Sequence, residues 1–159
     1  MELSIAVATE RRDYGELFDL YAAVVEEGGA FPRRPPADEA MFREAWIDGK
    51  TAVFVARAGS ALAGSYYLAP NFPGTAGHIA NAGYMVAAEF RRRGVGRGLV
   101  EHSLAAAKQL GFDAMMLNLV LERNPSHDLY RGLGFEPVGW VPEAVDGEDA
   151  AVYWRRLTG

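Results

Sequence analysis

The chain has 159 residues, half of them apolar and 23% charged, which suits one globular domain over residues 1–159. It lacks cysteine, which excludes disulfide scaffolding, thiolate catalysis and cysteine-ligated metal sites. The 16 basic and 21 acidic residues give a net charge of −5, which argues against broad electrostatic binding of nucleic acid. Because no long apolar run and no leader-like start occurs, we expect no membrane segment and a cytoplasmic location.

The spacing of apolar residues and the positions of glycine and proline predict seven strands and four helices. The predicted strands cover residues 3–8, 51–57, 61–68, 79–86, 112–121, 138–141 and 150–157. The predicted helices cover residues 13–26, 37–47, 99–110 and 125–133. The order βααβββαβαββ indicates a mixed α/β fold, and the helix that crosses from strand 79–86 to strand 112–121 makes these two strands parallel.

Several residues predict local details of these elements. Asp38 is the expected N-cap of the second helix, and Asn124 before Pro125 is the expected start of the fourth. Gly83, within the apolar strand 79–86, indicates a β-bulge or a close backbone approach. We expect the acidic segment 143–149 to be a loop between the last two strands.

Four arginines and three glycines crowd the stretch from Arg91 to Gly98, between a predicted central strand and a helix. A helix start offers unpaired N–H groups, glycine lets a phosphate come close, and arginine adds charged donors, so this stretch predicts an anion site. Glycine spacing alone leaves a solvated basic turn equally open. A Walker-type loop is excluded because Leu99 follows the glycines, and a dinucleotide-binding turn would need glycine at that position.

Arg91-x-x-Gly94-x-Gly96 resembles the signature of the GCN5-related N-acetyltransferase (GNAT) family, and Tyr130-x-x-x-Gly134-Phe135 resembles the second landmark of that family. By element order the resemblance covers nearly the whole chain. It implies the GNAT fold, a mixed central sheet of about seven strands flanked by about four helices. In that fold the strands 79–86 and 112–121 splay apart around the pantetheine arm of the cosubstrate, acetyl-CoA.

The resemblance also implies which residues hold acetyl-CoA. Backbone groups around Met85 and Val86 would bond the pantetheine arm, with the Val86 N–H as oxyanion donor, and the amides of the arginine–glycine stretch would hold the pyrophosphate. The cofactor-binding residues expected on this basis are Met85, Val86, Arg91, Arg92, Arg93, Gly94, Val95, Gly96, Arg97, Asn124 and Tyr130.

Making an amide from a thioester requires a neutral amine, a site for negative charge on the carbonyl oxygen, and stabilisation of the leaving thiolate. Tyr130 is the usual family candidate for protonating the thiolate, and the alternative is a tyrosine that only packs. Asn124 is the second catalytic candidate, and the alternative is an N-cap. Both roles of Asn124 are compatible, because capping uses its side-chain oxygen and leaves the amide N–H groups free.

Asn81 and Asn118 are single amides in otherwise apolar strands, and a buried amide needs partners, from a substrate or from the protein and water. A closer resemblance links Asn71-Phe72-Pro73-Gly74 and His78-x-x-Asn81-Ala82-Gly83-Tyr84 to fungal N-acetyltransferases that act on proline analogues such as azetidine-2-carboxylate. It implies that Asn81 anchors an amino-acid substrate and that backbone amides at Asn118 and Leu119 bind its carboxylate. It also implies that Asn124 faces the thioester sulfur and replaces Tyr130 as the main stabiliser of the thiolate.

Other side chains are weaker candidates. A general base is not obvious: His78, Glu26 and Glu27 are expected near the substrate mouth, and a water chain would serve equally well. His102 and His127 lack metal-ligand spacing, so we assign no metal. Four aromatic residues could line the acceptor pocket or belong to the core: Tyr66, Tyr67, Phe31 and Trp46.

The function expected is acetyl-CoA-dependent acetylation of the amine of a small molecule, such as an amino acid or a proline analogue, by direct attack on the thioester. Two alternatives stay open, a non-catalytic sensor domain that binds CoA or acyl-CoA and a protein N-acetyltransferase. The expected partner is a small-molecule amine, with a homodimer left open, and neither nucleic acid nor a membrane is expected.

Overall fold

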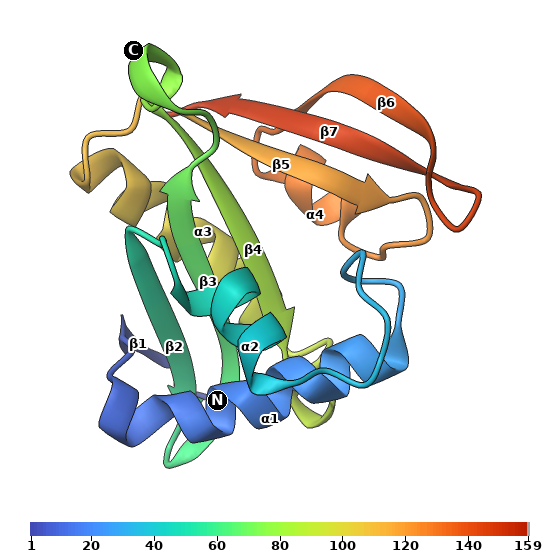
Figure 1. Cartoon of the computed structure of the whole chain (residues 1–159). Coiled ribbons are helices and arrows are strands. Elements are labelled where there is room, and N and C mark those ends of the chain that lie inside the picture. Colours follow the sequence, from blue (N-terminus) through green and yellow to red (C-terminus); the bar gives the residue numbers. More distant parts are fainter. Residues whose placement is uncertain (159) are drawn as a thin grey trace.

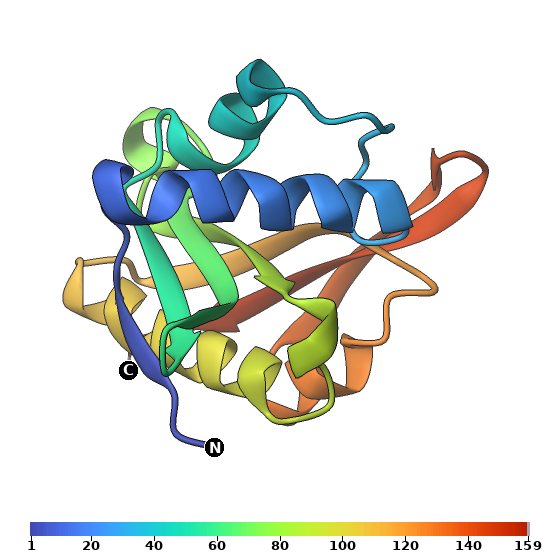
Figure 2. The ribbon, with the colours of Figure 1, turned by 90° about the horizontal axis from the view of Figure 1, so that it is seen from below.

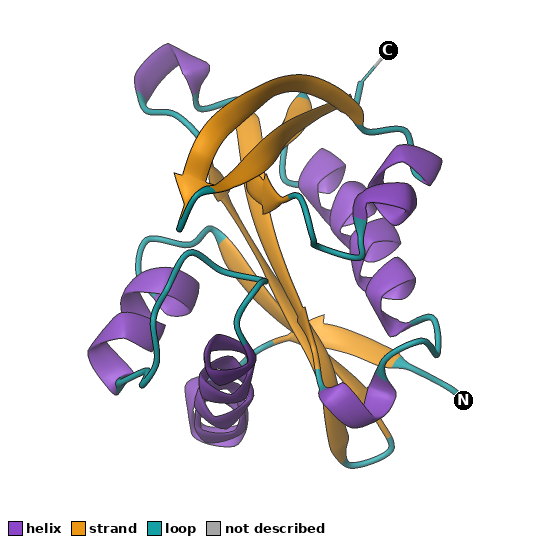
Figure 3. Cartoon of the chain, turned by 90° about the vertical axis from the view of Figure 1, so that its right-hand side faces the viewer, coloured by secondary structure: helices purple, strands orange, loops and turns teal. Residues whose placement is uncertain are grey.

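The computed structural model describes residues 1–158, and its centre is one mixed sheet with helices on both faces (Figures 1 and 3). The strands are β1 (Ser4–Val7), β2 (Ala52–Ala58), β3 (Ala61–Pro70), β4 (Ile79–Val86), β5 (Ala114–Leu121), β6 (Glu136–Val145) and β7 (Glu148–Arg156). The α-helices are α1 (Glu10–Glu27), α2 (Glu39–Phe42), α3 (Val95–Gln109) and α4 (His127–Gly132), and α2 continues as a π-helical turn, Arg43–Ile47. The predicted mixed α/β class and the predicted order of elements are confirmed.

The strand order is β1-β2-β3-β4-β5-β7-β6, and every neighbouring pair is antiparallel except β4 and β5. Side chains along a strand alternate between the two faces, which gives the sheet two separate cores. Val55 packs with α1 and α2 on one face, whereas the next residue, Ala56, belongs to the core under α3 and α4. Figure 2 shows α1 along one face and α3 along the other.

The central strands β4 and β5 pair over three residues only, from Ile79 opposite Ala114 to Asn81 opposite Met116. Beyond that point they diverge, as Figure 1 shows. The cause lies in β5, because its pairing with β7 shifts register between Leu117 and Val120, and Leu119 takes a left-handed φ of 47°. The predicted splay is therefore present, and a bulge on the C-terminal side of the fork produces it.

The bulge expected at Gly83 is wrong, because β3 and β4 stay in regular register through this residue. The alternative, a close approach, is present, but a side chain makes it and not the expected backbone. A Cβ at position 83 would lie 2.4 Å from Cε2 of Tyr67, a distance that no side chain tolerates. Gly83 thus lets the Tyr67 ring lie across the strand.

Three predicted boundaries are also wrong. α3 begins at Val95, four residues earlier than expected, because Gly94 adopts a left-handed φ of 84° and the glycines enter the helix. The expected acidic loop 143–149 is instead a continuation of both strands around a two-residue turn, Asp146 and Gly147. Both turn residues have positive φ, which is the Asp-Gly hairpin geometry. α4 begins at His127, so Asn124 precedes the helix by three positions.

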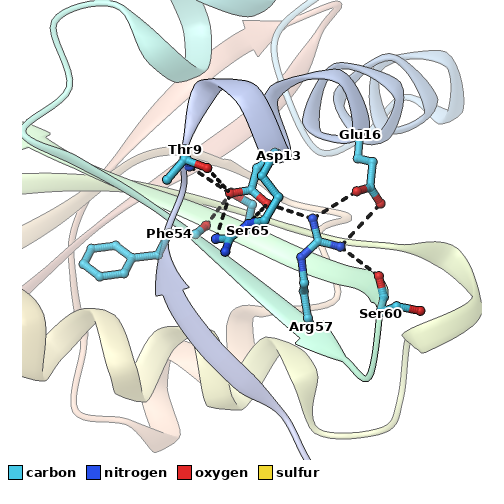
Figure 4. A network of polar contacts seen from close by, with 8 residues as sticks. Thr9, Asp13, Glu16, Phe54, Arg57, Ser60 and Ser65 are labelled. Atoms are coloured by element: carbon cyan, nitrogen blue, oxygen red, sulfur yellow. Dashed lines mark hydrogen bonds and ion pairs between the residues drawn. The ribbon is translucent and has the colours of Figure 1, made fainter.

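α1 begins at Glu10, three residues before the predicted start at Asp13. The buried carboxylate of Asp13 holds this end of the helix in place (Figure 4). The Asp13 carboxylate is fully buried, accepts from the Thr9 amide at 2.8 Å, and pairs with Arg57 of β2 at 2.8 Å. Burial raises the pKa of Asp13, but hydrogen bonds from Arg12, Arg57 and Thr9 outweigh it and hold the pKa at about 2. The predicted N-cap of α2 is confirmed, because Asp38 accepts from the Met41 amide at 2.8 Å.

Candidate active site

An open cavity of about 1030 Å³ fills the fork between β4 and β5 and reaches from the start of α3 to the end of α1. Twelve of the predicted site residues line it: Asn81, Met85, Val86, Arg91, Arg92, Gly94, Gly96, Arg97, Asn118, Leu119, Asn124 and Tyr130. The other two point elsewhere, since Val95 is buried in the core and the Arg93 guanidinium lies 5.8 Å from the centre of the Phe90 ring. Residues from distant parts of the sequence therefore meet in one hollow.

The first turn of α3 forms one end of this cavity. The first helical hydrogen bond runs from the Gly98 amide to the Gly94 carbonyl at 3.0 Å, so the amides of Val95, Gly96 and Arg97 have no partner within the helix. A Cβ at Gly94 would meet nothing within 4 Å, and one at Gly96 would lie 3.8 Å from Val86. Bare backbone, unpaired N–H groups and the positive end of the helix dipole together suit a phosphate.

Two of the four arginines of this stretch, Arg91 and Arg97, are paired with acids. Arg91 makes two hydrogen bonds of 2.6 Å to the Glu27 carboxylate at the end of α1, and its Nε donates to the Val86 carbonyl at 3.3 Å. Arg97 pairs with Glu101, one turn further along α3, at 2.9 Å. The Arg91 hydrogen bonds lower the pKa of Glu27. Glu27 is therefore an ionised partner of Arg91, and its lowered pKa makes it a weaker base for a substrate proton.

The backbone at the end of β4 faces the fork. The Ala87 amide bonds the Ala63 carbonyl at 2.8 Å, so the opposed pair Val86 and Gly64 exchanges no hydrogen bonds with each other. The Val86 N–H thus points away from β3, into the space that β5 has left. By the same alternation the Met85 backbone pairs with Ser65, and Tyr84 is the other residue whose backbone faces the fork.

The bulge in β5 supplies backbone groups from the opposite side of the fork. Leu117 pairs with Tyr153 and Val120 with Ala151, so three steps along β5 match two along β7. One residue of the pair Asn118 and Leu119 is left without a partner on β7. Since both residues line the cavity, their amides can serve a ligand instead of the sheet.

Asn81 and Asn118 both have partners within the protein. The Asn81 side chain accepts from the Tyr67 hydroxyl at 3.1 Å and donates to the Met116 carbonyl at 3.2 Å, which ties β4 to β5 where the fork begins. Asn118 donates to the Asn71 side chain at 2.6 Å. The two amides do not pair with each other.

Asn124 and Tyr130 both line the cavity. The Asn124 oxygen accepts from the Ser126 amide at 2.9 Å, which leaves its N–H groups free. Tyr130 is 7% exposed, and its ring packs against Tyr84, Phe135 and Tyr153. Burial raises the pKa of Tyr130 to about 12, which a hydrogen bond with Ser126 opposes. A thiol has a pKa of about 8.5, so Tyr130 is suited to donate a hydrogen bond to a thiolate rather than to surrender its proton.

Aromatic side chains form the other end of the cavity. Tyr21, Phe31, Trp46 and Tyr67 line it, and the centres of the Trp46 and Tyr67 rings are 4.9 Å apart. Of the two alternatives left open for Tyr66, the core position is correct, because this ring lies in the opposite core and its hydroxyl meets Nδ1 of His102 at 2.7 Å. Sequence reasoning missed Tyr21, although its place in the inner stripe of α1 was visible.

The remaining histidines have structural contacts. His127 bonds the Tyr153 hydroxyl at 2.6 Å and the Leu121 carbonyl at 2.8 Å, and His78 is exposed and meets the Thr75 carbonyl at 3.0 Å. Among residues 1–158, no group of three His, Asp or Glu side chains could hold a metal ion. In the same part of the chain, none of the helices is both long and apolar enough to cross a membrane.

Comparison with known proteins places this geometry in a family. The sequence model of the acetyltransferase (GNAT) family matches residues 11–135. N-acetyltransferase aca1 of Schizosaccharomyces pombe is 36% identical over 86 residues, which are 54% of this chain and 41% of that protein. This chain therefore spans less than half the length of that relative.

Solved structures support the same family assignment. A GCN5-related N-acetyltransferase from Kribbella flavida superposes with a TM-score of 0.88 at 31% identity over 97% of both chains. A phosphinothricin acetyltransferase from Sinorhizobium meliloti, solved in complex with acetyl-CoA, superposes with a TM-score of 0.86 over 99% of this chain and 90% of that one, and at 23% identity it shows the fold alone. The chain belongs to the acetyltransferase (GNAT) family, whose members transfer acetyl from acetyl-CoA to an amine.

Proposed function

We propose that this protein acetylates the amine of a small amino acid or amino-acid analogue with acetyl-CoA, by direct attack on the thioester. The observation that carries the proposal is the fork itself. One cavity has bare helix-start amides at one end, bulge amides on its β5 wall, and the free Val86 N–H between them. The acetyl-CoA that the Sinorhizobium meliloti protein binds, and the N-acetyltransferase name of the Schizosaccharomyces pombe relative, support the same reaction here.

The start of α3 would hold the pyrophosphate on the amides of Val95, Gly96 and Arg97, with Arg92 beside them. The pantetheine arm would then follow the free edge of β4, where the Tyr84 and Val86 backbones face the fork. This would place the acetyl carbonyl oxygen at the Val86 N–H, a donor aimed at the negative charge that develops there.

The acceptor amine attacks the acetyl carbon, a C–N bond forms, and the C–S bond then breaks with its electron pair going to sulfur. The Asn124 N–H groups and the Tyr130 hydroxyl are the donors available to the departing thiolate. We assign the amine proton to water, because Glu27 is the one carboxylate among the cavity-lining residues and its pairing with Arg91 makes it a weaker base.

The charges of the cavity favour an acceptor that carries a carboxylate. With Glu27 paired, no carboxylate of the lining remains to hold a second ammonium group, which disfavours polyamines and aminoglycosides. The amides of Asn118 and Leu119 could instead bind the carboxylate of an α-amino acid.

The proposal is tested by measuring thiol release from acetyl-CoA with a panel of amines that includes proline analogues, common amino acids, polyamines and aminoglycosides. We expect thiol release from acetyl-CoA with amino acids and with at least one proline analogue. The matched control is each amino acid against its amide, which keeps the amine and removes the carboxylate. Acetyl-CoA that raises the melting temperature without turnover on any amine would instead support a sensor, and preference for a peptide amine would support protein acetylation.

A further inference from the structure

The Tyr21 hydroxyl stands out among the buried polar groups of residues 1–158. The side chain is 1% exposed, lines the cavity from α1, and its hydroxyl proton meets no acceptor. Folded proteins rarely leave such a group unpaired, so each case needs a reason. The mechanism proposed above makes no use of this hydroxyl.

The surroundings of Tyr21 hold its ring in place and supply no acceptor. The ring packs against Phe31, Phe42 and Trp46 with centre-to-centre distances of 5.7, 5.7 and 6.3 Å. The polar atoms of the neighbouring aromatic rings are already used, since Trp46 Nε1 donates to the Ser65 hydroxyl and the Tyr67 hydroxyl donates to Asn81. The unpaired hydroxyl is thus fixed at the acceptor end of the cavity.

Arg33 is the charged group beside it. Burial raises the pKa of Tyr21, and the positive charge of Arg33 and a hydrogen bond from its guanidinium oppose that rise, so the guanidinium lies beside the hydroxyl oxygen. Arg33 is exposed, lines the cavity, and makes no ion pair with the described residues, whereas Arg91, Arg97 and Arg123 each pair with a glutamate. Guanidinium has only donors, so it cannot accept the Tyr21 proton. Tyr21 and Arg33 both lack a negatively charged acceptor.

We propose that Tyr21 and Arg33 form a second oxyanion-binding point, so that the acceptor carries an acidic group at its far end in addition to the carboxylate beside its amine. This inference rests on the proposed function, because it deepens the acceptor specificity of the same cavity. An oxyanion that displaces the exposed Arg33 side chain from the hydroxyl would accept from both groups at once. A carboxylate and a phosphorus oxyacid share this chemistry.

The test compares initial rates with glutamate, 2-amino-4-phosphonobutyrate and norvaline, which share an α-amino acid head and differ at the far end. The wild-type protein should show kcat/KM at least about tenfold higher for an acidic acceptor than for norvaline, because one charge-assisted hydrogen bond strengthens binding by about that factor. The better of the two acidic acceptors identifies the oxyanion. Equal kcat/KM for all three would overturn the inference.

Tyr21→Phe keeps the ring and removes only the hydroxyl. We expect KM for the acidic acceptor to rise about tenfold, with kcat and the KM of norvaline unchanged. Because the hydroxyl proton has no acceptor within the protein, the melting temperature should stay level or rise, whereas a hydrogen bond donated to the protein would make it fall. Arg33→Gln should raise the same KM, and Arg34→Gln, which removes the same charge from the neighbouring residue, should not. An effect of Arg34→Gln equal to that of Arg33→Gln would overturn a specific role for Arg33.

Binding of glutarate to the CoA-bound protein, measured by calorimetry, separates this inference from the proposed function. Glutarate has two carboxylates and no amine, so it cannot be acetylated. Binding that Tyr21→Phe weakens about tenfold would support the oxyanion point even if no amine were acetylated. Rapid acetylation of norvaline without measurable glutarate binding would leave the proposed function standing and remove this inference.

Discussion

The two ends of the cavity are built in different ways. The pyrophosphate end uses backbone amides from one continuous stretch, Gly94 to Arg97, and its geometry follows from glycine conformation and the start of a helix. The acceptor end draws side chains from α1, the loop after it, the π-helical turn, β3 and β4. The first end can therefore be recognised in the sequence as a motif, whereas the second exists only after folding.

This contrast also determines which substrate each end of the cavity recognises. Backbone amides recognise a group common to all members of a family, here a phosphate, and say little about the acceptor. Side chains such as Tyr21, Trp46 and Tyr67 can differ without disturbing the motif, so they set the acceptor. Substitutions at one end should therefore leave the Michaelis constant of the other substrate nearly unchanged.

The largest effect is expected at the start of α3. Gly96→Leu should weaken acetyl-CoA binding by more than about a hundredfold, because the new side chain takes the place of the phosphate and removes two or more charge-assisted hydrogen bonds. Gly94→Ala should have a smaller effect, since its Cβ meets open space and the cost is the left-handed φ of 84°. Calorimetry with CoA checks both, and circular dichroism checks that the fold is kept. Wild-type affinity in Gly96→Leu would place the pyrophosphate elsewhere.

Between the two ends, Tyr130→Phe should lower kcat about a hundredfold and Asn124→Ala about tenfold, as expected for donors to a developing charge. Neither should change the KM of acetyl-CoA by more than a fewfold. Because the pKa of Tyr130 is raised to about 12, its hydroxyl stays protonated at any pH well below that value. The rate should therefore rise with pH only as the ammonium group of the acceptor loses its proton. The opposite ranking of the two kcat values would make Asn124 the main stabiliser of the thiolate.

A smaller effect is expected for Glu27→Gln, which acts where α1 meets the arginine–glycine stretch. Loss of this carboxylate frees Arg91 and removes a negative charge near the phosphates, so acetyl-CoA affinity should rise about two- to fivefold. Glu101→Gln frees Arg97 in the same way and is the matched control. Weaker acetyl-CoA binding in Glu27→Gln alone would mean that the pair with Arg91 instead positions the Val86 carbonyl.

The smallest kinetic effect is expected at Asp13, which lies outside the cavity. Asp13→Asn should leave both KM values unchanged and lower the free energy of unfolding by about 2 kcal/mol at neutral pH, since folding lowers the carboxyl pKa from 3.8 to about 2. A lowered pKa stabilises the fold above pH 4, and this stabilisation is lost as the pH falls towards 2. Urea unfolding of both proteins at pH 7 and pH 2.5 checks this, and an equal difference at the two pH values would contradict it.

Apolar periodicity predicted the order of the elements and the parallel central pair. Twelve of the fourteen predicted site residues, most of them named from the family resemblance, line the cavity. The sequence did not predict which side of the fork bulges, because Leu119 takes its left-handed φ under tertiary constraint and no glycine marks the position. Pairing of Arg91 with Glu27 joins residues 64 positions apart, which no local pattern reveals. The Asp146-Gly147 turn was visible in the sequence, and the acidic composition of the segment obscured it.

The most direct measurement is a crystal structure of the protein with CoA and the amino acid that the panel selects. We predict pyrophosphate oxygens about 2.7–3.2 Å from the amides of Gly96 and Arg97, with the acceptor carboxylate at the amides of Asn118 and Leu119. A pyrophosphate bound away from the start of α3, or an acceptor bound outside the fork between β4 and β5, would contradict the account.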